Sequence, residues 1–73
     1  MNIKTIEQYI REYLKGKSWV AGGYLEQYVY NKKGTKGETT SRRCREMVND
    51  GVIENRYTLY KGRKIVQYQL AKQ

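Results

Sequence analysis

The spacing of apolar residues between positions 37 and 57 changes its period at Gly51, and this change constrains the fold more than any other feature of the sequence. Before Gly51, the least polar side chains fall on one side of a helix drawn at 100° per residue, and arginines fall opposite. The residues on that side are Thr40, Cys44, Met47 and Val48. After Gly51 the period becomes two, which is typical of a strand. Because helices commonly end at a glycine in the left-handed conformation, we expect a helix over 38–50, buried along one side, that runs directly into a strand over 52–60.

A first amphipathic helix is expected over residues 3–15. Apolar side chains recur there at helical spacing, at Ile3, Ile6, Ile10, Tyr13 and Leu14. Asn2 is a suitable N-cap residue for this helix. Lys15-Gly16 is a suitable end, because a cation is favourable at a helix C-terminus and glycine can leave the helix there.

A short apolar segment follows between Gly16 and Gly22-Gly23. Its length and its glycine boundaries predict a strand over 18–21 that places Trp19 or Val20 in the core. A second helix is then expected over 23–31.

The segment from Asn31 to Gly37 contains two glycines, three lysines and no apolar residue, which predicts a loop between the second and third helices. The cap of the third helix stays open among three hydroxyl residues, Thr39, Thr40 and Ser41.

The C-terminal part of the chain predicts a β-hairpin. Its second strand is expected over 64–70, and residues 60–64 form the turn, in which Gly62 can take a positive φ. The fold class is therefore α+β, as a single domain over residues 1–73. It consists of three helices, a short strand between helices one and two, and a C-terminal hairpin.

The residue types limit the chemistry that this chain can perform. With one cysteine and no histidine, the chain can form neither an internal disulfide nor a Cys–His zinc site, and it lacks the base of a Ser–His or Cys–His nucleophile. The seven acids form no paired motif, and no glycine-rich phosphate loop follows a strand. We therefore expect no enzyme, no cofactor, no metal and no small-molecule ligand. Without a long apolar run or a signal-peptide pattern, we expect no membrane association and a reducing cytoplasmic location.

The positive charge is concentrated in one half of the chain. The net charge is +8, and residues 32–64 hold ten of the 15 lysines and arginines against four acids. Such a basic region is typical of proteins that bind nucleic acids or another anionic surface. The simpler interpretation, a solvated helix face, accounts for many exposed arginines on small domains.

The order helix, short strand, helix, helix, strand, turn, strand, with SRRCREMVNDGVIENRY at its centre, resembles the winged helix-turn-helix DNA-binding domains. The similarity runs from Ile3 to Leu70. Its most specific parts are the end of the third helix, with Met47, Gly51 and Val52-Ile53, and the cationic tip of the hairpin. The loop before the third helix is longer than the tight turn of the plain helix-turn-helix, which favours the winged variant.

The resemblance implies double-stranded DNA as the partner and a role as a small transcriptional regulator or a factor that shapes DNA. In that family the third helix usually enters the major groove, and the hairpin, called the wing, contacts phosphate or the minor groove. The helix residues given this role are Thr39, Ser41, Arg42, Arg43, Arg45 and Asn49, and the wing residues are Lys61, Arg63 and Lys64. If the helix enters a groove, the loop lysines lie over the sugar–phosphate backbone: Lys32, Lys33 and Lys36. Arginine suits guanine, asparagine suits adenine, and lysines and hydroxyls suit the backbone.

Two points stay open in the sequence. Glu46 shares the outer face, so it either pairs with Arg42 or Arg43 or accepts a hydrogen bond from cytosine. The alternative function is a winged-helix protein–protein interaction module, for which exposed tyrosines would supply the contact surface; the same surface would allow a homodimer. The tyrosines considered are Tyr9, Tyr24, Tyr28 and Tyr30.

Overall fold

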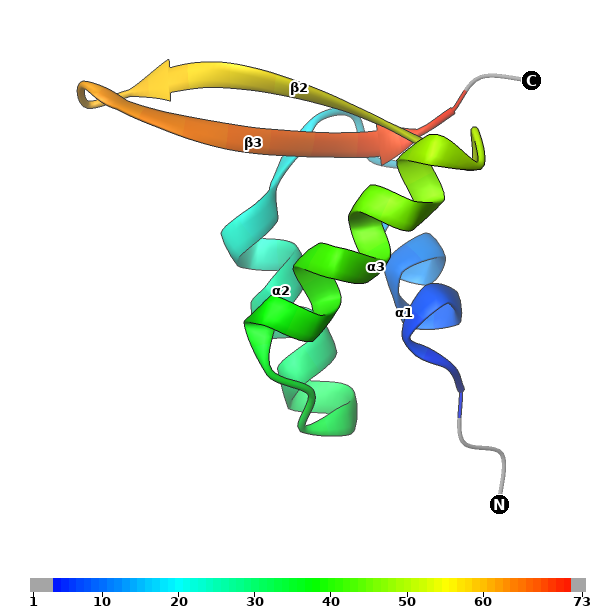
Figure 1. Cartoon of the computed structure of the whole chain (residues 1–73). Helices are drawn as coiled ribbons and strands as arrows, with labels where there is room; N and C mark the ends of the chain where they lie inside the picture. Colours follow the sequence, from blue (N-terminus) through cyan, green and yellow to red (C-terminus); the bar gives the residue numbers. More distant parts are fainter. Residues whose placement is uncertain (1–3, 72–73) are drawn as a thin grey trace.

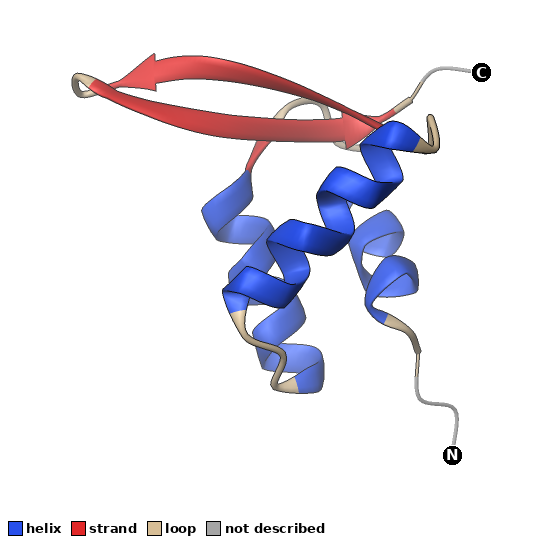
Figure 2. Ribbon diagram, in the orientation of Figure 1, coloured by secondary structure: helices blue, strands red, loops and turns tan. Residues whose placement is uncertain are grey.

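The structure is a computed structural model that describes residues 4–71, and these residues form three α-helices and three β-strands (Figures 1 and 2). In chain order the elements are α1 (Ile6–Leu14), β1 (Val20–Ala21), α2 (Gly22–Lys33), α3 (Gly37–Asn49), β2 (Ile53–Tyr60) and β3 (Arg63–Leu70). This arrangement confirms the expected α+β class with a C-terminal hairpin. Within the described residues, no helix is long and apolar enough to cross a membrane.

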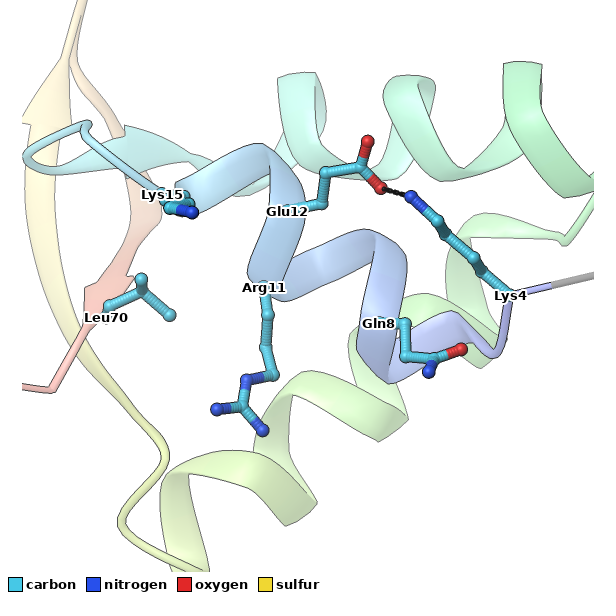
Figure 3. Close-up of a pocket in the computed structure, with 6 residues that line it drawn as sticks. All are labelled: Lys4, Gln8, Arg11, Glu12, Lys15 and Leu70. Atoms are coloured by element: carbon cyan, nitrogen blue, oxygen red, sulfur yellow. Dashed lines mark hydrogen bonds and ion pairs between the residues drawn. The ribbon is translucent and has the colours of Figure 1, made fainter.

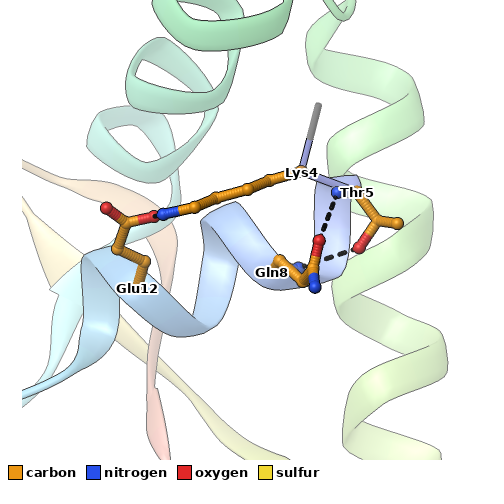
Figure 4. Close-up of polar contacts among 4 residues, drawn as sticks. All are labelled: Lys4, Thr5, Gln8 and Glu12. Atoms are coloured by element: carbon orange, nitrogen blue, oxygen red, sulfur yellow. Dashed lines mark hydrogen bonds and ion pairs between the residues drawn. The ribbon is translucent and has the colours of Figure 1, made fainter. Parts of the chain in front are cut away.

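Helix α1 begins later than the sequence pattern predicted, because a capping box fixes its first turn. The hydroxyl of Thr5 accepts a hydrogen bond from the backbone N–H of Gln8 at 3.2 Å, and the Gln8 side chain accepts one from the N–H of Thr5 at 2.7 Å (Figure 4). The helix therefore starts at Ile6 rather than at residue 3. Asn2, the predicted cap, lies outside the described residues.

The connection between α2 and α3 is also shorter than predicted. Helix α2 continues to Lys33, Gly34 caps it with a φ of 72°, and α3 starts at Gly37. Three residues connect the helices, so the longer loop that favoured the winged variant is wrong. The N-cap of α3 is Lys36, which makes no side-chain capping bond, so a cap at Thr39, Thr40 or Ser41 is also wrong.

Helix α3 ends as the glycine predicted. Gly51 has a φ of 77°, its N–H donates to the carbonyl of Val48 at 3.0 Å, and the N–H of Val52 donates to that of Met47 at 2.9 Å. These two bonds form a Schellman motif, which satisfies the last carbonyls of the helix and turns the chain directly into β2.

The sheet is antiparallel with the strand order β1-β3-β2. Strands β2 and β3 pair over their whole length, and only a two-residue turn separates the pair Tyr60↔Arg63. Lys61 and Gly62 in this turn both have positive φ, 51° and 77°, as a type I′ turn requires. The predicted five-residue turn is therefore wrong, and Arg63 and Lys64 belong to β3. Figure 1 shows that this hairpin projects well beyond the helices.

The core lies where the three helices meet the first part of the hairpin. Its buried apolar residues are Ile10, Leu14, Leu25, Val29, Cys44, Met47, Ile53 and Tyr68. The helix α3 side chains among them, together with Thr40, confirm the predicted buried side of that helix, and Val48 packs at its margin. Val20, rather than Trp19, packs against this core. Trp19 is half-buried beneath the guanidinium of Arg56, whose carbon lies 4.5 Å from the ring centre.

Candidate nucleic-acid interface

The outer side of α3 carries two exposed arginines near the middle of the helix. Arg42 and Arg45 are exposed, and they line a shallow groove with Ser41. Among residues 4–71 neither guanidinium forms an ion pair. Both can therefore donate to an incoming ligand without first breaking a contact within the protein.

One half-buried carboxylate borders the same groove. Glu26 on α2 lies so close to Gly37 that a Cβ at Gly37 would collide with a carboxylate oxygen. Burial raises the pKa of Glu26 above its usual value. Gly37 thus allows α2 and α3 to approach closely, and the groove is lined by two cations, Arg42 and Arg45, and two acids, Glu26 and Glu38.

The opposite flank of α3 is different in charge. Arg43 pairs with Glu46 at 3.1 Å and approaches Glu7 of α1 at 3.8 Å. This pair is the intrahelical alternative considered for Glu46. Asn49 and Asp50 line a hollow with the same three side chains. The predicted helix residues therefore do not form one surface: Arg43 and Asn49 lie in a net negative region that faces α1.

The three lysines predicted for the loop occupy other positions. Lys32 and Lys33 belong to the last turn of α2. The Lys32 ammonium lies 5.6 Å from the ring centre of Tyr28, and Lys33 donates to the carbonyl of Lys4 at 3.3 Å. Lys36 is exposed immediately before α3. Thr39 is exposed within the first turn of that helix.

The wing carries positive charge without compensation. Residues 55–66 include four cations and no acid. Lys61 lies at the turn, 5.4 Å from the ring centre of Tyr60, and the Lys64 ammonium lies 4.5 Å from that of Tyr57. Exposed Arg63 pairs in register with Tyr60. The wing therefore presents cations that alternate with aromatic rings.

The wing also exposes three apolar side chains that the sequence pattern did not place in the site. Tyr57, Leu59 and Tyr60 have exposed fractions of 61%, 75% and 59%. The alternation of these residues predicts the face of the hairpin on which each one lies. It does not predict how far the hairpin extends past the helices. The two-residue turn is the signal that was missed. It extends each strand to eight residues, or about 26 Å at the usual rise.

A separate hollow follows α1 and carries both signs of charge (Figure 3). Lys4 and Glu12 point toward each other there, with Nζ and Oε2 2.6 Å apart. Their hydrogen bond raises the pKa of Lys4 and lowers the pKa of Glu12. In the part of the chain that the structure describes, no three His, Cys, Asp or Glu side chains are grouped to hold a metal ion.

Comparison with known proteins gives a match at the level of structure. No family model matches the sequence, and a search of curated proteins finds no match. Among solved structures, the chain is similar to Stf76 from the Sulfolobus islandicus plasmid-virus pSSVx, with a TM-score of 0.78 and 21% sequence identity. The match covers 96% of this chain and 86% of that chain. The two proteins share a fold. Three helices followed by a hairpin, as residues 4–71 show, are compatible with a winged-helix fold.

Proposed function

We propose that this protein binds double-stranded DNA, with α3 in the major groove and the hairpin as a wing against the adjacent backbone. The role that we propose is that of a small transcriptional regulator or a factor that shapes DNA. The proposal rests mainly on one observation. Arg42 and Arg45 of α3 are exposed and unpaired within the described residues, and the wing of the same chain carries four cations and no acid.

The two parts of this surface have different chemistry. A guanidinium can donate two hydrogen bonds to O6 and N7 of guanine, so Arg42 and Arg45 are suited to reading bases. Lysine ammonium groups suit phosphate, because the contact there depends on charge more than on direction. We assign Lys61, Arg63 and Lys64 to the backbone. Ser41 and Thr39, at the start of α3, are suited to phosphate or sugar contacts.

Other predicted residues take smaller parts in the proposal. Glu7 and Glu46 offset the charge of Arg43, so its contribution to phosphate binding is small. Asn49 would read a base only if the duplex approached the acidic end of α3, which like charge opposes. Of the lysines near the helix connection, Lys36 is the one placed at the start of α3, and we assign it to the backbone.

A salt-series binding assay tests the proposal. Duplex and single-stranded probes of the same sequence are titrated with the protein at several salt concentrations. We expect tighter binding to the duplex, with log K falling linearly against log salt by about 0.9 per phosphate contacted. A shallow salt response with no preference for duplex would contradict DNA binding and would favour the protein-interaction alternative.

A further inference from the structure

The apolar face of the hairpin continues outward past the helices that cover its first part. Side chains at alternate positions of β2 share one face, and Ile53 at the start of this series is buried, with an exposed fraction of 1%. Tyr57 and Leu59 occupy the same face but are 61% and 75% exposed. Figure 1 shows that the end of the hairpin near the turn extends beyond the helices. Tyr57 and Leu59, which we call the wing stripe, thus lie on the same face of β2 as buried Ile53, but no other part of the described chain covers them.

The wing stripe continues the face of the hairpin that packs against α3. Asn55 of β2 pairs in register with Tyr68, and Tyr57 follows two residues later on the same face. Tyr68 is buried in the core cluster that includes Cys44 of α3. The stripe therefore lies on the helix-facing side of the hairpin, farther toward the turn.

The charge around the stripe selects its partner. Lys64 pairs in register with Leu59, and its ammonium lies over the ring of Tyr57. Lys61 follows at the turn, and no acid occurs between residues 55 and 66. A second copy of this wing would bring cations against cations, which opposes self-association through the stripe. A DNA duplex instead offers phosphates for the cations and the apolar faces of stacked bases for Tyr57 and Leu59.

We propose that Leu59, supported by Tyr57, acts as an apolar wedge that enters the minor groove, opens a base step and bends the duplex. Lys64, on the same face as the stripe, and Lys61, at the turn, hold the adjacent phosphates. Apolar side chains that insert between base steps kink DNA by about 20–90° toward the major groove. This inference rests on the proposed function, and it gives the wing a mechanical role beyond charge.

The test measures bending by energy transfer between dyes at the two ends of a short duplex. The central step is either TA, which unstacks easily, or part of a stiff A-tract. The unaltered protein should bend the TA duplex by at least about 20° and bind it about tenfold more tightly than the A-tract duplex. Leu59→Ala should abolish both the bend and the preference. Its salt slope should stay unchanged, because no phosphate contact is lost.

Two variants serve as controls on the same hairpin. Tyr60→Ala removes a side chain of similar exposure from the opposite face of β2, so it should keep the bend. Lys61→Ala should lower the salt slope by about 0.9 and weaken binding to the TA and A-tract duplexes equally. Because all three side chains are exposed, thermal melts should show equally stable folds.

Each further outcome decides the inference. Binding by the unaltered protein without a bend, or a bend that Leu59→Ala retains, would overturn the wedge and leave the proposed function intact. If Tyr60→Ala lost as much bending as Leu59→Ala, the wedge could not be assigned to the face of β2 that carries Leu59. If the free protein self-associates and Leu59→Ala abolishes this association, the stripe is an interface between copies of the chain and not a wedge. If the unaltered protein binds no duplex, the proposed function falls, and the wedge falls with it.

Discussion

Thr40 lies in the core with a hydroxyl that has no partner. Its side chain is fully buried, and Oγ1 makes no hydrogen bond within residues 4–71. The carbonyl of Lys36, one turn earlier, would be the usual acceptor, but it already receives the N–H groups of Thr39 and Thr40 at 3.1 and 3.2 Å. We therefore predict that Thr40→Val stabilises the fold.

The expected gain follows from what the substitution changes. An unsatisfied buried polar group costs about 1–3 kcal/mol, and valine replaces the hydroxyl with a methyl group of similar size. Both residues are β-branched, so their helix propensities nearly cancel. The free energy of unfolding should rise by about 1–3 kcal/mol, and the melting temperature should rise by about 4–8 °C for each kcal/mol in a domain of this size.

Urea and thermal unfolding of two neighbouring variants measure this effect. Thr39→Val is the control: it makes the same chemical change on the same helix, one residue away and exposed, and should alter stability by less than about 0.5 kcal/mol. A loss of stability in Thr40→Val would contradict the reasoning, because it would mean that the hydroxyl has a partner in solution.

Three further predictions concern the buried side of α3 and the core. Met47→Asp should cost several kcal/mol, comparable to the whole stability of a small domain, whereas Arg42→Ala should leave the melting temperature nearly unchanged; equal melting temperatures would refute the assigned faces. A thiol reagent should label buried Cys44 slowly in the folded protein and rapidly in denaturant, and fast native labelling would place the thiol at the surface. Burial is the main cause that raises the pKa of Cys44 from 9.0 to about 12, and that of Tyr68 from 10.0 to about 12. Between about pH 9 and pH 12 the unfolded chain releases these two protons while the folded protein still holds them. The free energy of unfolding should therefore be highest below about pH 9 and should fall toward pH 12. Denaturation curves that show stability rising over this range would contradict the assignment.

The elements with a strong local pattern could be predicted from the sequence. The spacing of Cys44 and Met47 fixed the buried side of α3, and Gly51 fixed its end, because both signals depend on residues close together in the chain. The predicted ends of the helices were less accurate. Polar composition does not separate a loop from an exposed last turn, so Lys32 and Lys33 were placed in a loop although cations are favourable at a helix C-terminus.

The candidate site was predictable only where exposure alone decided it. Arg42 and Arg45 point outward by helical geometry, as expected. The pairing of Arg43 with Glu7 depends on how α1 packs against α3, which no local pattern shows. The exposure of Leu59 likewise depends on the distance that the hairpin extends past the helices, which is a property of the whole fold.

The central claim is that α3 reads bases and the wing holds the backbone. Its most direct test compares Arg45→Ala with Lys64→Ala on a selected duplex site and on random duplex, each at two salt concentrations. Arg45→Ala should cost about 1–3 kcal/mol on the selected site and much less on random DNA. Lys64→Ala should weaken binding to both duplexes equally and lower the salt slope by about 0.9. If both variants lose the same modest affinity on every sequence, the arginine and the lysine belong to one undirected cationic surface, and the account of α3 as a reader is wrong.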